Sequence, residues 1–452
     1  MTSGAHLNNR PVITQESFVS ILRAEMTTPQ KIKMWADKSL ACGINQLIYH
    51  GTPYRYNPGE YGPEGWNTWS SPFVPYVNFS TGMNESDPFW KDLKTVNQYL
   101  ARCQYALRAG KPQTDALIYV PFVDFTEDQL AVNPEEILYR GYYKAVEPDI
   151  WGFGTFASPD TPINRWYKKL WAVVNALEAN GISWEFVNDE SLQKAKLTNA
   201  HLSIEGNPYQ TLILANLPYI NLATAKHITA LSKGGLRLWT IGELPRKQPS
   251  YLDYATNDRL ASQLIAEASR QKNSRAVTGE MPLNTLAQPV RFAQRVAFSR
   301  QITREMTDGS QVKFLWNKSD QWQTIALNLD NRFQNSYWLN PENGHVEQNT
   351  GRTVRYRLPP YGSVILYASA KRALAPALLS SPDLSAEQAQ PVLTIENWTI
   401  KAGEVTLPNH PLVDWRTNDQ LKHKSDEGIY TASFRLENPV PAARYFVDLG
   451  KV

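Results

Sequence analysis

The chain has 452 residues, of which 42% are hydrophobic and 20% charged, and its formal net charge is +3. This length exceeds one ordinary hydrophobic core, so we expect two to four domains. The small net charge, without a basic stripe, argues against a nucleic-acid partner. No stretch holds the roughly 18 apolar residues of a membrane span, so no membrane partner is expected. Cys42 and Cys103 fit no zinc or redox spacing and are expected to be buried structural thiols.

Residues 11–51 predict a strand, a helix and a second strand. The helix over 29–41 begins at a proline that suits a first helical turn and ends before Gly43. The run "INQLIYHG" at 44–51 is typical of a short buried strand. This order is one strand–helix unit plus the next strand, as in an α/β barrel. A further helix is predicted over 88–110.

Polar side chains that could take part in catalysis or binding lie where these two strands end. Glu16 closes the first apolar run and His50 the second, and Tyr54 and Tyr56 follow in a long irregular loop. Barrel enzymes place their catalytic groups at such strand ends. Each residue also has a structural alternative: a helix-start carboxylate for Glu16, a satisfied half-buried side chain for His50, and loop packing for the tyrosines. Asp37 is expected on the outward side of the helix, in a surface or capping role.

The rest of the chain predicts α/β and β domains. Residues 113–275 alternate strands and helices and predict a doubly wound parallel sheet of the flavodoxin or amidotransferase type. The period changes to two over 276–372, which predicts a β-sandwich. Residues 373–390 have the composition of a linker, and 391–452 predict the start of a second, jelly-roll-like β-sandwich of carbohydrate-binding type. Too few strands follow for a stable sandwich, so both ends of the chain look cut.

Three runs carry a family resemblance: "ITQESF" at 13–18, "WADKSLACGINQLIYHGTPY" at 35–54, and "DPFWKDLKTVNQYLARCQYALRAGKPQTDALIYVP" at 87–121. Together they resemble the family 106 glycoside hydrolases, the α-L-rhamnosidases. The resemblance implies a (β/α)8 catalytic barrel followed by accessory domains. It also implies hydrolysis of terminal α-L-rhamnosyl linkages with inversion, by two carboxylates and a nearby calcium ion.

On this resemblance, residues 1–112 are the last strands and helices of a truncated barrel. Glu16 would end the seventh strand as the general base, and His50, Tyr54 and Tyr56 would bind substrate. No residue matches the general acid, and the calcium ligands are not located. We therefore expect a fragment that is inactive alone, whose partners are a rhamnose-containing glycan and a separately encoded barrel half, if there is one. Family habit implies a periplasmic or extracellular location, although the chain shows no signal peptide.

One other class of function remains open, and two more are disfavoured. A non-catalytic carbohydrate-binding or scaffold protein would suit the β segments and the missing barrel strands. An amidotransferase in the α/β domain is disfavoured, because that domain contains neither cysteine nor a nucleophile elbow. A nucleotide-dependent dehydrogenase is disfavoured because no Gly-x-Gly-x-x-Gly follows the strand at 116–121.

Overall fold

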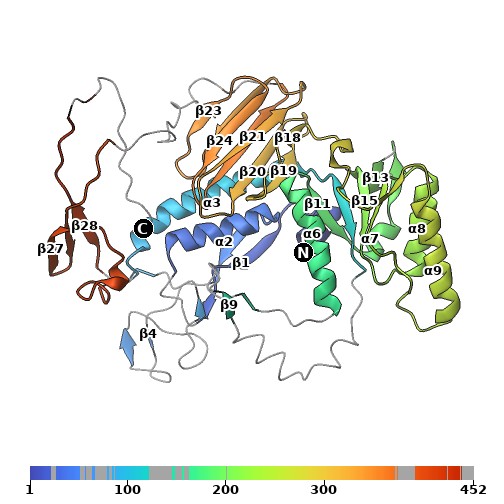
Figure 1. Cartoon of the computed structure of the whole chain (residues 1–452), viewed down its shortest axis with the longest axis horizontal. Helices are drawn as coiled ribbons and strands as arrows, with labels where there is room; N and C mark the ends of the chain where they lie inside the picture. Colours follow the sequence, from blue (N-terminus) through green and yellow to red (C-terminus); the bar gives the residue numbers. More distant parts are fainter. Residues whose placement is uncertain are drawn as a thin grey trace.

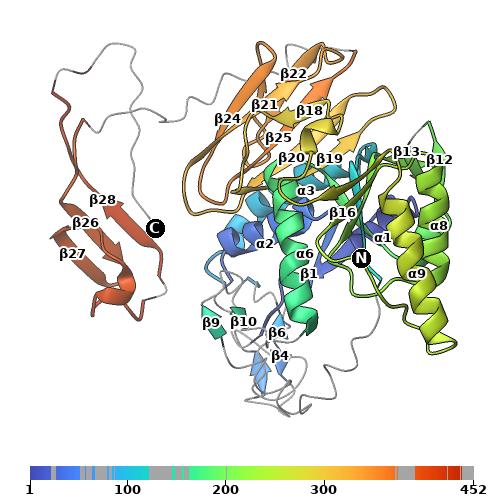
Figure 2. The same ribbon diagram turned by 45° about the vertical axis from the view of Figure 1, so that its right-hand side comes forward.

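The structure is a computed structural model. Apart from a few short pieces between them, the residues it describes are 1–21, 27–50, 87–121, 162–199, 201–371, 392–424 and 426–437. The mixed α/β and β organisation predicted from the sequence is confirmed at that level (Figure 1). Figure 2 shows the N-terminal elements lying between the α/β sheet and the antiparallel sheets.

The N-terminal unit consists of two strands and two helices, in the order β1 (Thr14–Ser17), α2 (Pro29–Ala41), β3 (Gln46–Tyr49) and α3 (Leu93–Arg108). β1 and β3 are parallel, and Glu16 lies opposite Ile48. α2 begins where the sequence predicts, because Pro29 suits the first turn and the Thr28 side chain accepts a hydrogen bond from the Lys31 amide. The chain before β1 forms a short helix, α1 (Thr2–Leu7), which the sequence did not predict.

The two faces of the β1–β3 sheet differ in burial. Leu47 and Tyr49 pack with Phe18 into a core that α2 and α3 complete. On the opposite face Glu16 is exposed, and Ile48 beside it is 47% exposed. Because successive side chains of a strand point to opposite faces, the sheet has one face packed on helices and one face open.

The α/β unit is a five-stranded sheet in which every pairing is parallel. Its strand order is β11-β8-β15-β16-β17, the 2-1-3-4-5 order of flavodoxin-like folds. The strands are β8 (Ala116–Tyr119), β11 (Trp184–Val187), β15 (Thr211–Ala215), β16 (Leu238–Ile241) and β17 (Ser274–Val277). The helices are α6 (Pro162–Ala179), α7 (Asp189–Gln193), α8 (Leu222–Lys233) and α9 (Tyr254–Ser269). In both views α8 and α9 lie side by side, with the sheet between them and α6.

A small antiparallel sheet is inserted after α7, and the sequence did not predict it. It consists of β12 (Lys196–Thr198), β13 (His201–Ile204) and β14 (Asn207–Tyr209). Leu202, Ile204 and Tyr209 are buried in the same core as the parallel sheet. The insertion therefore extends the core of the α/β unit.

Two antiparallel sheets follow and share a hydrophobic core. The larger has the order β23-β22-β25-β20-β19-β7 and the smaller β18-β21-β24. Their strands are β7 (Lys111–Pro112), β18 (Val290–Phe292), β19 (Ser299–Glu305), β20 (Gln311–Asn317), β21 (Gln323–Leu329), β22 (Asn335–Leu339), β23 (Val346–Gln348), β24 (Thr353–Leu358) and β25 (Ser363–Ser369). The other face of the larger sheet packs on α2 and α3 through Val312, Phe314 and Trp316.

The remaining elements are small. β26 (Trp398–Ala402), β27 (Val405–His410) and β28 (Gly428–Thr431) form an antiparallel sheet that lies apart from the others (Figures 1 and 2). The short strand pairs are β2 (Ser20–Ile21) with β6 (Phe79–Ser80), β4 (Tyr56–Asn57) with β5 (Gly65–Trp66), and β9 (Ala145–Glu147) with β10 (Thr155–Phe156). The described residues also form the short 3-10 helices η2 (Trp90–Asp92), η3 (Leu283–Thr285) and η5 (Trp415–Thr417).

Two residue predictions are wrong. Asp37 does not lie at the surface: its side chain is fully buried, and Lys33, one turn earlier on α2, supplies the opposite charge at 2.8 Å. Tyr99 from α3 donates a second hydrogen bond to the same carboxylate. Cys42 is exposed rather than buried, because it caps the C-terminus of α2 where the helix reaches solvent. Cys103, in contrast, is fully buried as expected.

Candidate functional site

Glu16 and His50 meet at the carboxyl ends of β1 and β3. Glu16 Oε1 lies 3.6 Å from His50 Nε2, and the two side chains are 67% and 18% exposed. The His50 backbone amide donates a hydrogen bond to the Ser17 carbonyl, 3.0 Å away, which continues the parallel pairing past the end of β3. The separation is longer than a hydrogen bond, but the contact brings a carboxyl group and an imidazole to one edge of the sheet.

Strained backbone follows Glu16 directly. Phe18 has a φ of 69°, in the left-handed region that bulky residues rarely adopt. Its ring is 4% exposed and packs on Tyr49 at a centroid distance of 4.8 Å and on Trp35 at 6.4 Å. Such a conformation costs about 1–3 kcal/mol and persists only where packing holds it. The aromatic cluster therefore fixes the turn by which the chain leaves β1, and with it the position of Glu16.

A hollow of about 500 Å³ adjoins Glu16 along β1 and α2. Among the described residues, ten line it, and Glu16 is the one carboxylate among them. Hydrolysis by inversion needs two carboxyl groups. A catalytic role for Glu16 therefore stays a prediction, and such a role would need a second carboxyl group from elsewhere.

The structure describes one of the two predicted tyrosines, Tyr56. Tyr56 lies on β4, in the loop after β3, and its side chain is 37% exposed. Tyr54 lies outside the described residues. The substrate-binding role of both tyrosines therefore stays a prediction.

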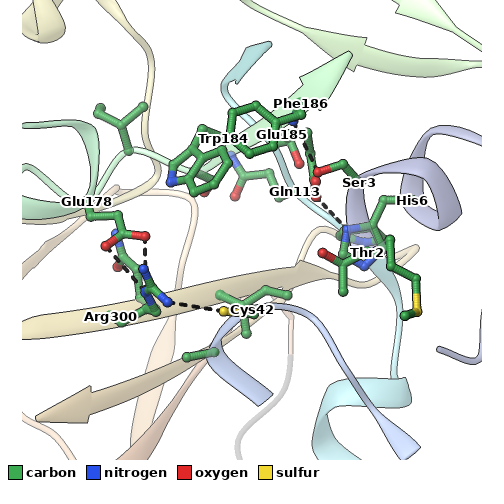
Figure 3. A pocket seen from close by; sticks show the side chains of 18 of the residues that line it. Thr2, Ser3, His6, Cys42, Gln113, Glu178, Trp184, Glu185, Phe186 and Arg300 are labelled. Atoms are coloured by element: carbon green, nitrogen blue, oxygen red, sulfur yellow. Dashed lines mark hydrogen bonds and ion pairs between the residues drawn. The ribbon is translucent and has the colours of Figure 1, made fainter. Parts of the chain in front are cut away.

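A second polar site, which sequence reasoning missed, lies between α1, α6, β11 and β19 (Figure 3). In it His6 Nδ1 is 2.5 Å from Glu185 Oε1. Arg300 Nε is 3.2 Å from Glu178, and Arg300 Nη1 is 3.2 Å from Cys42 Sγ. His6 and Glu185 are 179 residues apart in the chain, and no local sequence motif marks either of them.

Neither a metal site nor a membrane span is found among the described residues. No group of three or more His, Cys, Asp and Glu side chains that could hold a metal ion occurs among the described residues. The run "DFTEDQ" at 124–129, which is acidic enough for a hard cation but has no ligand spacing, lies outside the described residues. None of the described helices has both the length and the apolar character of a membrane span.

Comparisons with known proteins point to the glycoside hydrolases. The family model of alpha-L-rhamnosidase, glycoside hydrolase family 106, matches residues 1–138. A protein of Formosa agariphila, provisionally named as a beta-glucuronidase, is 24% identical over 259 residues, which are 57% of this chain and 17% of that protein. The resemblance that the sequence motifs indicate is therefore confirmed over the N-terminal part of the chain.

A solved structure shows a similar fold. The rhamnosidase from Novosphingobium sp. PP1Y superposes with a TM-score of 0.58 at 16% identity, over 96% of this chain and 39% of that one. An exo-carrageenase from Bacteroides ovatus covers 75% of this chain with a TM-score of 0.42 at 8% identity. At such identities the rhamnosidase likeness concerns the fold alone. The chain spans well under half of the length of these proteins.

Proposed function

We propose that this chain carries the seventh and eighth strands of the catalytic barrel of a glycoside hydrolase. The enzyme would remove terminal α-L-rhamnose from plant or microbial polysaccharides or glycosides. One observation carries the proposal: within the segment that matches the family, Glu16 and His50 stand together at the carboxyl ends of two parallel strands joined by a helix. In barrel enzymes this edge of the strands holds the active site.

The burial of the β1–β3 sheet supports this assignment. A barrel strand has helices on its outer side and the barrel interior on its inner side. β1 and β3 have this arrangement on the outer side, where Leu47 and Tyr49 pack against the core of α2 and α3. Glu16 and Ile48 share the open inner face, which is the face that further strands would cover in a closed barrel.

In this mechanism Glu16 is the general base. Its carboxylate takes a proton from a water molecule while the water oxygen bonds to the anomeric carbon and the glycosidic bond breaks. A protonated carboxyl on an earlier strand gives its proton to the leaving oxygen, at about 6.5–9.5 Å from the base in inverting enzymes. His50 orients the Glu16 carboxylate, and Tyr54 and Tyr56 contact the sugar ring.

Calcium belongs to the proposal only as an implication of the family resemblance. Ca²⁺ takes about six to eight oxygen ligands. The described residues do not fit such a site, since they contain no group of three or more His, Cys, Asp or Glu side chains that could hold a metal ion. No step of the mechanism is therefore assigned to calcium. A periplasmic or extracellular location and a rhamnose-containing glycan as partner are proposals on the same basis.

The test measures release of p-nitrophenol from p-nitrophenyl α-L-rhamnoside. The chain alone should release none, and a version joined to the first six strands of a family barrel should be active. In that version Glu16→Gln should lower kcat by several orders of magnitude with an unchanged circular dichroism spectrum. Glu64→Gln, an exposed carboxylate beside β5, is the matched control and should leave kcat within about twofold.

A loss below about tenfold for Glu16→Gln, or roughly 1.4 kcal/mol of barrier, would make that residue structural. The second candidate function is non-catalytic carbohydrate binding. It is favoured by the 67% exposure of the Glu16 side chain. Rhamnose binding by the barrel-restored version without any hydrolysis would support this second function.

A further inference from the structure

A cavity of about 230 Å³ lies where α1, the C-terminal end of α6, β11 and β19 meet. Liquid water occupies about 30 Å³ per molecule, so the cavity has room for roughly eight water molecules or one small solute. Its lining residues come from the N-terminal unit, the α/β unit and the larger antiparallel sheet, as Figure 3 shows for the labelled residues. A polar solute of this size is the kind of ligand that such a space can hold.

One wall of the cavity is aromatic. Trp184 and Phe186 stand on β11 with ring centroids 4.8 Å apart, and Trp171 from α6 meets Trp184 edge-on at 6.3 Å. All three rings line the cavity, and Trp171 is 41% exposed. Flat aromatic faces offer apolar contact to a ring with its own apolar face, and Trp adds a polar N–H at its edge. A linear polyol would make little use of this wall.

The other walls carry two carboxylates, each with a side-chain partner. Glu178 is paired with Arg300 at 3.2 Å, and Glu185 with His6 at 2.5 Å. Figure 3 places these two pairs on opposite sides of the view. The carboxylates of Glu178 and Glu185 disfavour an anion in this space. They also keep capacity to accept hydrogen bonds from hydroxyl groups.

Two side chains at the cavity have buried polar atoms without a hydrogen-bond partner among the described residues. His6 is 4% exposed, and its Nε2 is buried without a hydrogen bond. Gln301 has both its amide nitrogen and its amide oxygen buried and unbonded. Buried polar groups are nearly always satisfied by protein, water or ligand. The Gln301 amide can donate through its nitrogen and accept through its oxygen, and hydroxyl groups, which both donate and accept, can pair with either atom.

We propose that this cavity is a binding site for one neutral monosaccharide, stacked on the Trp171–Trp184–Phe186 wall and hydrogen-bonded through its hydroxyls to His6, Gln301 and the two glutamates. The site is distinct from the candidate catalytic edge, since Glu16 does not line it. Cys42 lines both the cavity and the hollow beside Glu16. The inference does not depend on the proposed rhamnosidase activity, and either can fail without the other.

Isothermal titration calorimetry with L-rhamnose on the full chain tests the proposal. Saturable binding of one molecule per chain in the millimolar range is expected, and glycerol should give no saturable heat. Trp171→Ala should weaken the affinity at least about tenfold. The matched control is Trp322→Ala, an indole that is 50% exposed on the antiparallel sheets, and it should leave affinity unchanged. Glu16→Gln should also leave the affinity unchanged.

The reactivity of the two cysteines tests where the sugar binds. Cys42 is exposed and Cys103 is fully buried, so a chromogenic disulfide reagent should modify Cys42 alone. Saturating L-rhamnose should slow this reaction several-fold in the unmodified chain and in Glu16→Gln, but not in Trp171→Ala. Unreactive Cys103 in each variant shows that the core is intact.

Three results would overturn the proposal: no saturable heat up to the solubility of the sugar, affinity that Trp171→Ala leaves unchanged, or binding that Glu16→Gln abolishes. The third result would place the sugar in the hollow beside Glu16, and it would support the proposed function while refuting the second site. The first would show that water alone satisfies His6 and Gln301.

Discussion

Lys313 gives the sharpest test of the physical account of this fold. It lies in the middle of β20, is 2% exposed, and points from the larger antiparallel sheet toward the core. Its ammonium donates a hydrogen bond to Thr303 Oγ1 at 3.1 Å and lies 5.8 Å from the Phe292 ring. Burial lowers the pKa of Lys313 to about 8, although the negative charge of Asp115 acts in the opposite direction. We predict that Lys313→Met stabilises the protein at neutral pH.

The size of the gain follows from the pKa. The ordinary lysine value is 10.5, and one pH unit corresponds to about 1.36 kcal/mol. Keeping Lys313 charged in the folded state at pH 7 therefore costs about 3 kcal/mol. Methionine fills the volume of the lysine stem without a charge, but it leaves Thr303 without its donor, a loss of about 1 kcal/mol. The expected net gain at pH 7 is about 2 kcal/mol.

The gain should depend on pH in a defined direction. Because the pKa of Lys313 is lower in the folded state, the unfolded chain holds more protons between pH 8 and the ordinary value of 10.5. The stability of the unmodified protein therefore rises with pH across this window. The advantage of Lys313→Met should shrink over the same window and vanish near its upper end.

Urea unfolding followed by circular dichroism, at intervals from pH 7 to pH 10, measures the difference between the two proteins. Lys401→Met, an exposed lysine on β26, serves as the control and should change the free energy of unfolding by less than about 0.5 kcal/mol. The other lysines and the tyrosines titrate equally in the unmodified protein and in Lys313→Met, so their contributions cancel in the difference. A loss of stability at pH 7, or a gain that does not change with pH, would refute the reasoning.

Two further substitutions test buried contacts of the N-terminal unit. Asp37→Ala should lower the free energy of unfolding by about 1–3 kcal/mol, because it leaves the buried Tyr99 hydroxyl without this acceptor and removes the nearer of the two carboxylates of Lys33, while Glu342 remains at 3.3 Å. Ala at exposed Asp92 should lower it by less than about 0.5 kcal/mol in the same urea assay. Gly110→Ala should lower the free energy of unfolding more than Gly206→Ala. Both glycines have positive φ, but a Cβ at 110 would lie 2.2 Å from the Glu305 carbonyl oxygen, whereas a Cβ at 206 would meet nothing within 4 Å. An Asp37→Ala loss under about 1 kcal/mol, or equal losses at the two glycines, would contradict these assignments.

Local signals predicted the elements that have clear periodicity. The helix expected over 29–41 matches α2, because a proline at its start and a glycine after its end mark both limits. The helix expected over 88–110 instead divides into η2 (Trp90–Asp92) and α3 (Leu93–Arg108). α1 and β12–β14 were missed, because elements of three to six residues are too short to show a period.

The candidate site was predictable only where it depends on strand order. Parallel neighbouring strands bring their carboxyl ends to one edge, so Glu16 and His50 had to lie close once β1 and β3 paired. The burial of Asp37 was missed because a lone charge on an amphipathic helix suggests the solvent side. Its lysine partner at position 33 had the i,i+4 spacing that could have indicated an ion pair. The sugar cavity was not predictable, since its walls come from distant parts of the sequence.

Buried polar contacts also explain why the open face of the β1–β3 sheet is the face to examine for chemistry. Arg304 on β19 donates to the carbonyls of Ala109 and Gly110 at 3.0 and 2.8 Å, which ties the end of α3 to the larger sheet. Tyr99 joins α3 to Ser363 on β25 at 2.7 Å. A shift of the helices over that sheet would leave these buried groups unpaired, at about 1–3 kcal/mol for each group. The packed side of the unit is therefore fixed, and a sugar or a further strand can approach Glu16 from the opposite, open face.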